Sequence, residues 1–334
     1  MRRLGRLVLL LALLAVGALI DAHRVLYEPV ALGNEATLTV DEGLPFAALA
    51  ERLADKGWIA AAPRGPAYLR AYARINGIER RLQAGDYRVV PGMNAAQILD
   101  LIVSGKSILY ELRIVEGWSF REALDAVRVH PQLRQTLGAA DAAAVMDAIE
   151  RKGEHAEGSL FPDTYRFSRG TTDRAFLRRA AGTMDQVLAQ EWDAREEGLP
   201  YASALEALTM ASIVEKETGA PEERARIAGV FVRRLQLGMR LQTDPTVIYG
   251  LGEAFDGNLR RRDLETDGEY NTYIRAGLPP SPICLPGRAA IHAALHPAAG
   301  DELFFVARGD GTHEFSATLD QHQAAVRRYQ LKGK

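Results

Sequence analysis

Residues 203–219 read SALEALTMASIVEKETG and contain the most informative pattern in the chain. Ser203 and Glu206 have the spacing of a capping box, and Gly219 is a typical C-terminal stop, so we expect one helix between them. Residues 207–214 are apolar or small around the whole circumference of that helix. Since a helix that is apolar on all sides is usually enclosed by protein, the segment predicts a buried helix.

Two carboxyl side chains stand at the end of this helix. Glu215 directly follows the buried stretch, and burial raises the pKa of a carboxyl because it disfavours the charged form. A raised pKa suits a general acid that works near neutral pH. Glu217 is a rival, but two positions correspond to about 200° around a helix, so both carboxyls cannot point into one site. Periodicity does not choose between them, and two solvated glutamates beside an unrelated Lys216 remain the alternative.

Side chains of the kinds that bind sugars gather in two later segments. The first, residues 239–250, reads MRLQTDPTVIYG and follows a helix expected to begin at Pro221 and to end at Gly238. The second contains YNTY at 270–273 and GLPPSPI at 277–283. Amide and carboxylate groups hydrogen-bond to sugar hydroxyls, flat rings stack on the sugar face, and proline-stiffened loops hold both. We expect a carbohydrate site here, with polar turn residues and core tyrosines as the alternative.

The N-terminus predicts a membrane anchor. Three arginines within the first six residues precede residues 7–20, an uncharged run that ends at Asp21. The run is short for a spanning helix, which needs about 20 apolar residues, but residues 4–6 lengthen it. Positive flanks stay in the cytoplasm, so the rest of the chain is expected outside the membrane. A cleaved signal peptide is the alternative, and it exports the rest of the chain as well.

The composition limits the class of protein. The 334 residues suggest about two domains. With 47% hydrophobic and 25% charged residues, the chain can form a packed core. A net charge of −2 is not typical of a dedicated nucleic-acid binder. Cys284 is the only cysteine, which excludes an intrachain disulfide and a thiolate cluster.

The pattern of elements predicts an α+β fold. Short strands are expected at residues 36–40, 86–90 and 108–115. Capping boxes predict helix starts at Asn94 and Ser119. Residues 303–307 and 312–316 flank a glycine turn and predict a C-terminal β-hairpin. The expected parts are a membrane anchor (1–22), a juxtamembrane connector (23–35), a small βααβ unit (36–107) and a larger helix-rich domain (108–334).

One histidine pair has the spacing of a metal site. His292 and His296 lie four residues apart on a short Ala-rich helix, a spacing that can hold zinc. No acidic residue lies between them, and a third ligand is not evident in the sequence. We expect capping or packing roles for this pair, with no metal and no cofactor.

Short motifs follow one another in a fixed order through the last part of the chain. They are ASIVEKET (211–218), RL (234–235), GM (238–239), LQTDPTVIYG (241–250), YNTY (270–273), GLPP (277–280), HP (296–297), GTHEF (311–315) and QH (321–322). Together they are specific, and the chain resembles the endolytic murein transglycosylase family, membrane-anchored enzymes that cut peptidoglycan glycan strands. The resemblance covers essentially the whole chain.

The resemblance has consequences for the fold and the site. It implies that Glu215 rather than Glu217 is the catalytic acid and that residues 36–107 form a LysM-like glycan-binding module. We assign substrate positioning to Gln242, Asp244, Tyr249, Asn271 and Tyr273. The expected location is the cell inner membrane, spanned once, with the C-terminal bulk periplasmic or extracytoplasmic. Expected partners are peptidoglycan glycan strands, penicillin-binding proteins and the elongation or division machinery, but no nucleic acid.

The expected reaction needs a single carboxyl. Glu215 would protonate the bridging oxygen of the β-1,4 bond between N-acetylmuramic acid and N-acetylglucosamine. The C6 hydroxyl of the same sugar would then trap the oxocarbenium-like centre and leave a 1,6-anhydro end, which would limit nascent strand length. An intramolecular nucleophile lessens the need for a second carboxylate. Two alternatives are a two-carboxylate muramidase that uses Asp244 and a non-catalytic peptidoglycan-binding scaffold.

Overall fold

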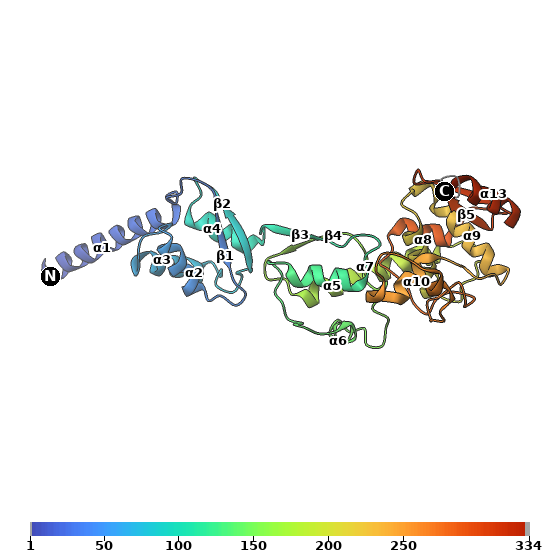
Figure 1. Ribbon diagram of the computed structural model, residues 1–334. Helices are drawn as coiled ribbons and strands as arrows, with labels where there is room; N and C mark the ends of the chain where they lie inside the picture. Colours follow the sequence, from blue (N-terminus) through green and yellow to red (C-terminus); the bar gives the residue numbers. More distant parts are fainter. Residues whose placement is uncertain (1, 331–334) are drawn as a thin grey trace. The chain divides into compact units, whose positions relative to one another are not determined.

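Residues 2–330 are described by a computed structural model that is rich in helices (Figure 1). Its strands form two-stranded sheets, an apolar helix begins the chain, and a small hairpin lies near its end. The α+β fold class is therefore confirmed, whereas the domain boundaries remain predictions. The chain divides into two compact units, each of which is described by itself. Within the described residues, the first comprises 2–110, 131–134 and 166–171, and the second comprises 111–130, 135–165 and 172–330.

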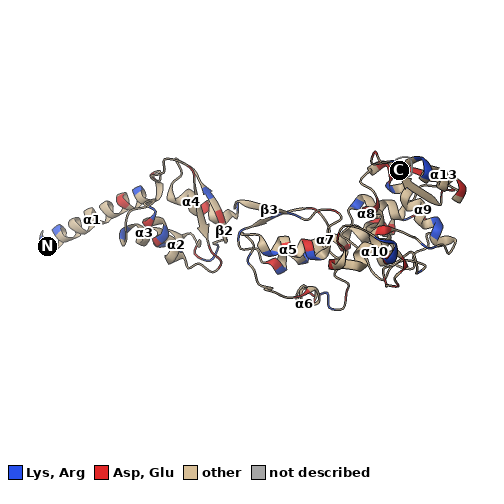
Figure 2. Ribbon diagram, viewed as in Figure 1, with Lys and Arg blue, Asp and Glu red and all other residues tan. Residues whose placement is uncertain are grey.

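Helix α1 (Arg2–Tyr27) contains the apolar run. Its stretch Arg3–Tyr27, 25 residues, is long and apolar enough to cross a membrane. At about 1.5 Å per residue it measures about 37 Å, which exceeds the hydrocarbon core of a bilayer, about 30 Å. The leucines from Leu4 to Leu19 are all more than half exposed, and Figure 2 shows the charged residues of α1 near its ends. The helix is thus consistent with a single-pass anchor.

The first unit is built around an antiparallel pair of strands. β1 (Ala36–Val40) pairs with β2 (Gly85–Val89), within one residue of the strands expected there. The helices of the unit are α2 (Phe46–Asp55), α3 (Arg64–Ile75) and α4 (Ala95–Ser104). The expected capping box at Asn94 is confirmed at the start of α4. Strands and helices share one core, whose fully buried members include Leu38, Leu49, Leu69, Tyr87 and Ile98.

The C-terminal end of α1 packs onto this unit. The helix continues past Asp21, which pairs with Arg64 at 3.4 Å. Val25 and Leu26 are buried in the core of the first unit. Residues 23–27, expected to begin a connector, are therefore helical because their apolar side chains have a core to pack on.

The second unit begins within a two-stranded sheet. β3 (Leu109–Arg113) and β4 (Thr164–Ser168) form this sheet, and the chain passes from one unit to the other within both strands. Helix α5 (Phe120–Val129) begins at the capping box expected at Ser119. Helices α6 (Ala142–Ala148) and α7 (Asp173–Asp193) complete this part of the chain.

Helix α8 (Ala204–Glu217) is buried, as its sequence predicts, with every residue from Ala207 to Val214 enclosed. Helices α7, α9 (Arg224–Gln236) and α12 (Arg288–Leu295) pack against it. The hairpin consists of β5 (Phe304–Ala307) and β6 (His313–Ser316). The other elements are η1 (Pro221–Glu223), α10 (Asp244–Leu251), η2 (Gly252–Ala254), α11 (Arg261–Glu265) and α13 (Leu319–Tyr329).

The ends of α8 differ in detail from the prediction. The Ser203 hydroxyl accepts from the Glu206 N–H at 3.3 Å, as in a capping box. The Glu206 carboxylate, however, accepts from the N–H of Ala202 at 2.7 Å, so the box is only half formed. The helix ends because Thr218 is extended, and Gly219 does not adopt the left-handed conformation of a glycine stop.

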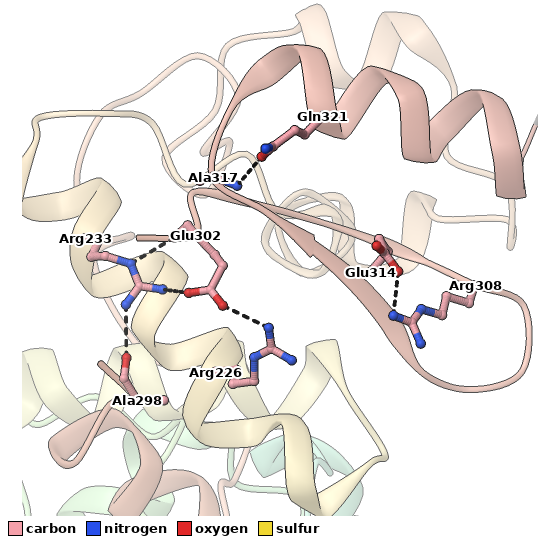
Figure 3. A network of polar contacts seen from close by, with 8 residues as sticks. All are labelled: Arg226, Arg233, Ala298, Glu302, Arg308, Glu314, Ala317 and Gln321. Atoms are coloured by element: carbon pink, nitrogen blue, oxygen red, sulfur yellow. Dashed lines mark hydrogen bonds and ion pairs between the residues drawn. The ribbon is translucent and has the colours of Figure 1, made fainter. Parts of the chain in front are cut away.

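Glu302, just before the hairpin, ties it to α9 (Figure 3). Its carboxylate accepts from Arg226 at 2.8 Å and from Arg233 at 3.2 Å. Its carbonyl accepts from Arg233 Nε at 2.8 Å, and the same guanidinium donates to the carbonyl of Ala298 at 3.0 Å. These bonds fix the base of the hairpin against one helix.

The close approach of α9 to Ala298 predicts a requirement for glycine at position 229. A Cβ added to Gly229 would lie 2.5 Å from the Ala298 carbonyl oxygen. We expect Gly229→Ala to lower the free energy of unfolding by about 1–3 kcal/mol through this overlap, although alanine favours a helix by about 1 kcal/mol. Urea denaturation measures it. Gly182→Ala on α7, where an added Cβ meets nothing within 4 Å, is the control and should not destabilise. Equal effects of the two changes would contradict the prediction.

Candidate active site

Glu217, the last residue of α8, lines a cavity of about 500 Å³. This volume lies within the range of small-molecule sites, about 300–1,000 Å³. The hairpin contributes apolar walls through Phe304 and Phe305. The polar and charged side chains around the cavity are Glu217, Arg234, Gln242, Asp244, Tyr273, His313, His322 and Gln330. Helix α8 therefore ends with a carboxyl in a ligand-sized space that combines apolar and polar walls.

Burial raises the pKa of Glu217 to about 7. The Thr243 hydroxyl, which donates to Glu217 Oε1, acts against this rise. The negative charge of Asp244 adds to the rise, whereas His313 and Arg234 oppose it. A carboxyl with this pKa can be protonated near neutral pH, which is the requirement for a general acid.

A buried network of threonines holds the backbone of Thr243. The Thr246 hydroxyl donates to the Thr243 carbonyl at 2.8 Å, so its hydrogen bond of 2.9 Å with Thr272 must use the Thr272 proton. The Thr272 oxygen in turn accepts from the Thr243 N–H at 3.1 Å. All three residues are buried. The network therefore anchors the residue whose hydroxyl donates to Glu217 Oε1.

The loop between α9 and α10 brings predicted residues to the cavity. Gly238 turns the chain after α9 with a φ of 68°, as expected. Gln242 has a φ of 52°, an unfavourable value for a residue with a Cβ, and its N–H donates to the Thr272 carbonyl at 3.1 Å. Asp244 accepts from the Tyr273 hydroxyl at 2.6 Å. Backbone strain held in place by its surroundings is frequent at functional sites.

Glu215 lies in different surroundings, although it is only two residues from Glu217. Its side chain is 7% exposed. Oε2 accepts from the Gly287 N–H at 2.9 Å, and Oε1 is 3.8 Å from the guanidinium of Arg224. Burial raises the pKa of Glu215, and the Gly287 hydrogen bond opposes this rise. Among the described residues, the lining of the 500 Å³ cavity includes Glu217 but not Glu215. The choice of Glu215 as the acid remains a prediction.

Asn271 and Tyr249 lie outside the lining of this cavity. Asn271 is 4% exposed, and its amide donates to three backbone carbonyls in and just after α11. Its oxygen accepts from the Tyr273 N–H at 2.9 Å, so it fixes the loop that presents Tyr273. Of the five residues predicted to position substrate, Gln242, Asp244 and Tyr273 line the cavity.

Tyr249 belongs to a second polar cluster. Its hydroxyl donates to Glu157 Oε2 at 3.2 Å, and Glu157 Oε1 accepts from the Phe120 N–H at the start of α5 at 2.8 Å. Burial raises the pKa of Glu157 to about 7. Both side chains line a separate cavity of about 330 Å³. The cap on α5 gives Glu157 a structural role that the sequence pattern did not reveal.

Glu191, His292 and His296 form the group that could hold a metal ion. His292 Nδ1 is 2.8 Å from a Glu191 oxygen, and the other carboxylate oxygen pairs with Arg288 at 2.8 Å. Both ring nitrogens of His296 lie within hydrogen-bonding distance of backbone carbonyls. These contacts provide the packing roles expected for the pair, and the expected absence of a metal remains a prediction.

An apolar N-terminal helix, a small first unit and a helix-rich second unit with a carboxyl-bearing cavity define a class of α+β protein. Within this class, the chain belongs to the YceG-like family, whose model matches residues 38–328. A crystal structure of a yceG-like protein from Listeria monocytogenes is 31% identical, with a TM-score of 0.55; the match covers 88% of this chain and 99% of that chain.

Two curated relatives bear the same name. The endolytic murein transglycosylase of Bacillus subtilis (strain 168) is 30% identical, and the match covers 95% of this chain and 91% of that protein. The endolytic murein transglycosylase of Streptococcus pneumoniae serotype 2 (strain D39) is 28% identical over 68% of this chain. The match spans 46% of that longer protein.

Several cavity residues had no role in the sequence analysis. Arg234, His313 and His322 occur in motifs that carry the resemblance, but motif membership does not indicate which side of a cavity a side chain occupies. Arg234 donates to the carbonyls of Leu303 and Leu241, both at 2.7 Å, and so links α9, the hairpin and the loop before α10. Only the packing of these segments brings the three side chains together.

The raised pKa of Glu217 predicts a pH dependence of stability. Between its ordinary pKa of 4.5 and about 7, the unfolded chain releases this proton while the folded chain retains it. Rising pH therefore destabilises the folded state across this range, and the effect levels off above about pH 7. As the pH rises from about 5 to about 8, we expect the free energy of unfolding to fall less for Glu217→Gln than for the wild type. Urea denaturation at each pH measures this. The exposed Glu35→Gln is the control, and identical slopes for all three proteins would contradict the prediction.

Proposed function

We propose that this chain is an endolytic murein transglycosylase, which cuts the β-1,4 bond between N-acetylmuramic acid and N-acetylglucosamine within glycan strands. The cavity at the end of α8 carries the proposal, because a carboxyl with a raised pKa faces a space lined by the predicted sugar-binding side chains. The Bacillus subtilis relative, matched over nearly its whole length, supports the same activity. Cleavage inside strands would limit their length during synthesis.

We assign the acid role to Glu217, with Glu215 as the rival to be tested. Glu217 lines the cavity together with Gln242 and Asp244, whereas the Glu215 carboxylate is occupied by the Gly287 N–H and lies near Arg224. Burial raises the pKa of both carboxyls and a guanidinium opposes the rise at each, so the pKa does not choose between them. Geometry thus favours the carboxyl that a substrate in the cavity can reach.

The reaction follows from one acid in an enclosed site. Glu217 donates its proton to the glycosidic oxygen, and the bond from C1 to that oxygen breaks. The C6 hydroxyl of the same N-acetylmuramic acid attacks C1 and closes a 1,6-anhydro ring while its proton passes to a base in the cavity, so no water is consumed. Gln242 and Tyr273 would hydrogen-bond to sugar hydroxyls, and the apolar wall would limit access of water that could compete for C1.

A muramidase is the second candidate, because Asp244 brings a second carboxylate to the same cavity. In an inverting hydrolase such a group activates water, and in a retaining hydrolase it attacks C1. The Tyr273 hydroxyl donates to Asp244 Oδ1, which gives this carboxylate an alternative role in holding the tyrosine. The products of the reaction distinguish the two enzymes.

The first unit supports a finer proposal, that residues 36–107 are a LysM-like glycan-binding module. Its element order, β1, α2, α3 and β2, is the expected βααβ order. Helix α1 would anchor the chain in the inner membrane with both units outside the cytoplasm, since the arginines precede the apolar run. At that surface the enzyme would meet nascent glycan strands, the penicillin-binding proteins and the elongation or division machinery.

Paired substitutions on α8 test the acid. Glu217→Gln keeps the size and the hydrogen bond to Thr243 but cannot donate the proton, so we expect kcat on purified sacculi to fall by about 10²–10⁴-fold. Glu215→Gln should retain activity within a few-fold of the wild type. Release of muropeptides by the full chain in detergent, with circular dichroism as the check on folding, measures both.

The opposite ranking of the two variants would assign the acid to Glu215. Wild-type protein that binds sacculi but releases no muropeptides would instead favour a non-catalytic scaffold.

The cleavage products test the second carboxylate. We expect wild-type products to end in 1,6-anhydro-N-acetylmuramic acid, lighter by one water molecule than hydrolysed ends in mass spectrometry. Asp244→Asn should slow the reaction without changing this product, because the internal hydroxyl remains the nucleophile. Hydrated reducing ends from the wild type, together with loss of cleavage in Asp244→Asn, would identify a muramidase.

A further inference from the structure

A second acid–base pair lies at the same cavity. His313, the first residue of β6, places Nδ1 2.7 Å from Glu223 Oε2, and its backbone N–H donates to Glu223 Oε1 at 2.9 Å. The two side chains are 13% and 11% exposed. Because the Glu223 carboxylate hydrogen-bonds to both the ring and the backbone N–H of His313, it fixes the orientation of the imidazole.

The carboxylate also fixes the tautomer. Because Glu223 accepts the hydrogen bond, Nδ1 carries the proton of the neutral ring, and Nε2 is left as the basic nitrogen. His313 lines the cavity that Glu217 lines, and Phe305 packs edge-on to the imidazole at 5.4 Å between ring centroids. The titratable and charged side chains around this histidine and its cavity are Glu217, Glu223, Arg234, Asp244, Tyr273 and His322.

We propose that His313, oriented by Glu223, is the base that receives the C6 hydroxyl proton in the reaction proposed above, on which this inference rests. Glu217 gives its proton to the departing glycosidic oxygen as the C1–O bond breaks. The C6 oxygen bonds to C1, its O–H bond breaks, and that proton moves to His313 Nε2. Transfer of the proton from the imidazolium to Glu217, directly or through water, restores both groups for the next turnover.

Charge balance in the cavity supports separate roles for Glu217 as the acid and His313 as the base. Once Glu217 has donated its proton, a carboxylate remains in poorly hydrated surroundings, where an unpaired charge is costly. Protonation of His313 at the same stage places a positive charge in the same cavity as that carboxylate, and a charged His313 favours the ionised form of Glu217. Glu223 stabilises the imidazolium in the same way that the buried aspartate does in a serine-protease triad.

A purely structural role for the pair predicts a different behaviour. In that case Glu223 and His313 only clamp the hairpin to η1, much as Glu302 clamps it to α9. Loss of the clamp would lower stability and raise KM, but it would not lower kcat selectively. Separate measurements of kcat and KM therefore distinguish the two roles.

The test compares His313→Gln, Glu223→Gln and wild-type protein as full chains in detergent on purified sacculi. We expect His313→Gln to lower kcat by about 10²-fold or more with little change in KM. Glu223→Gln should lower kcat by a smaller factor, again with little change in KM, because the imidazole loses the carboxylate that orients it. The exposed His155→Gln is the matched control and should behave as the wild type.

Each outcome has a defined meaning. A His313→Gln protein that keeps the wild-type kcat overturns the inference. If His313→Gln does not fold, an unchanged kcat in Glu223→Gln overturns it, and a lowered kcat with an unchanged KM supports it. Loss of cleavage in Glu217→Gln with wild-type behaviour of both variants refutes only this inference, whereas full activity of Glu217→Gln refutes the assignment of the acid beneath it.

Discussion

The structure of the second unit depends on one constraint, which is that an ionisable carboxyl ends a helix enclosed on every side. Helix α8 has no solvated face along its central two turns, so the chain that follows must provide polar partners for Glu217. The Thr243 hydroxyl does so by donating to Glu217, while the neighbouring threonines hold the Thr243 backbone. The rest of the cavity surrounds the carboxyl of Glu217, whose raised pKa lets it keep its proton near neutral pH.

Loops and a hairpin complete the walls of a cavity that helices α8, α9 and α13 also line, and these irregular segments are attached to helices. Glu302 binds two arginines of α9, and Arg234 of the same helix donates to the hairpin and to the loop before α10. Asn271 closes the loop that carries Tyr273 through hydrogen bonds to the backbone. Such attachments let short irregular segments hold side chains at fixed positions, as a preorganised site requires.

The sequence predicted most of the fold because its signals are local. Strands β1 and β2, the capping boxes before α4 and α5 and the burial of α8 all follow from residues a few positions apart. The site was harder to predict, because Glu215 and Glu217 have the same local pattern and differ only in what packs around them. His313 is separated by ninety positions from the glutamate that orients it, and no periodicity reports such a pair.

Helix α1 enters the first unit without a break, and Val25 and Leu26 form part of the core of that unit. The membrane-length segment of α1 is therefore joined to the first unit by continuous helix rather than by a flexible linker. In a bilayer, the tilt of α1 would therefore set both the height of the first unit above the lipid headgroups and the direction that this unit faces.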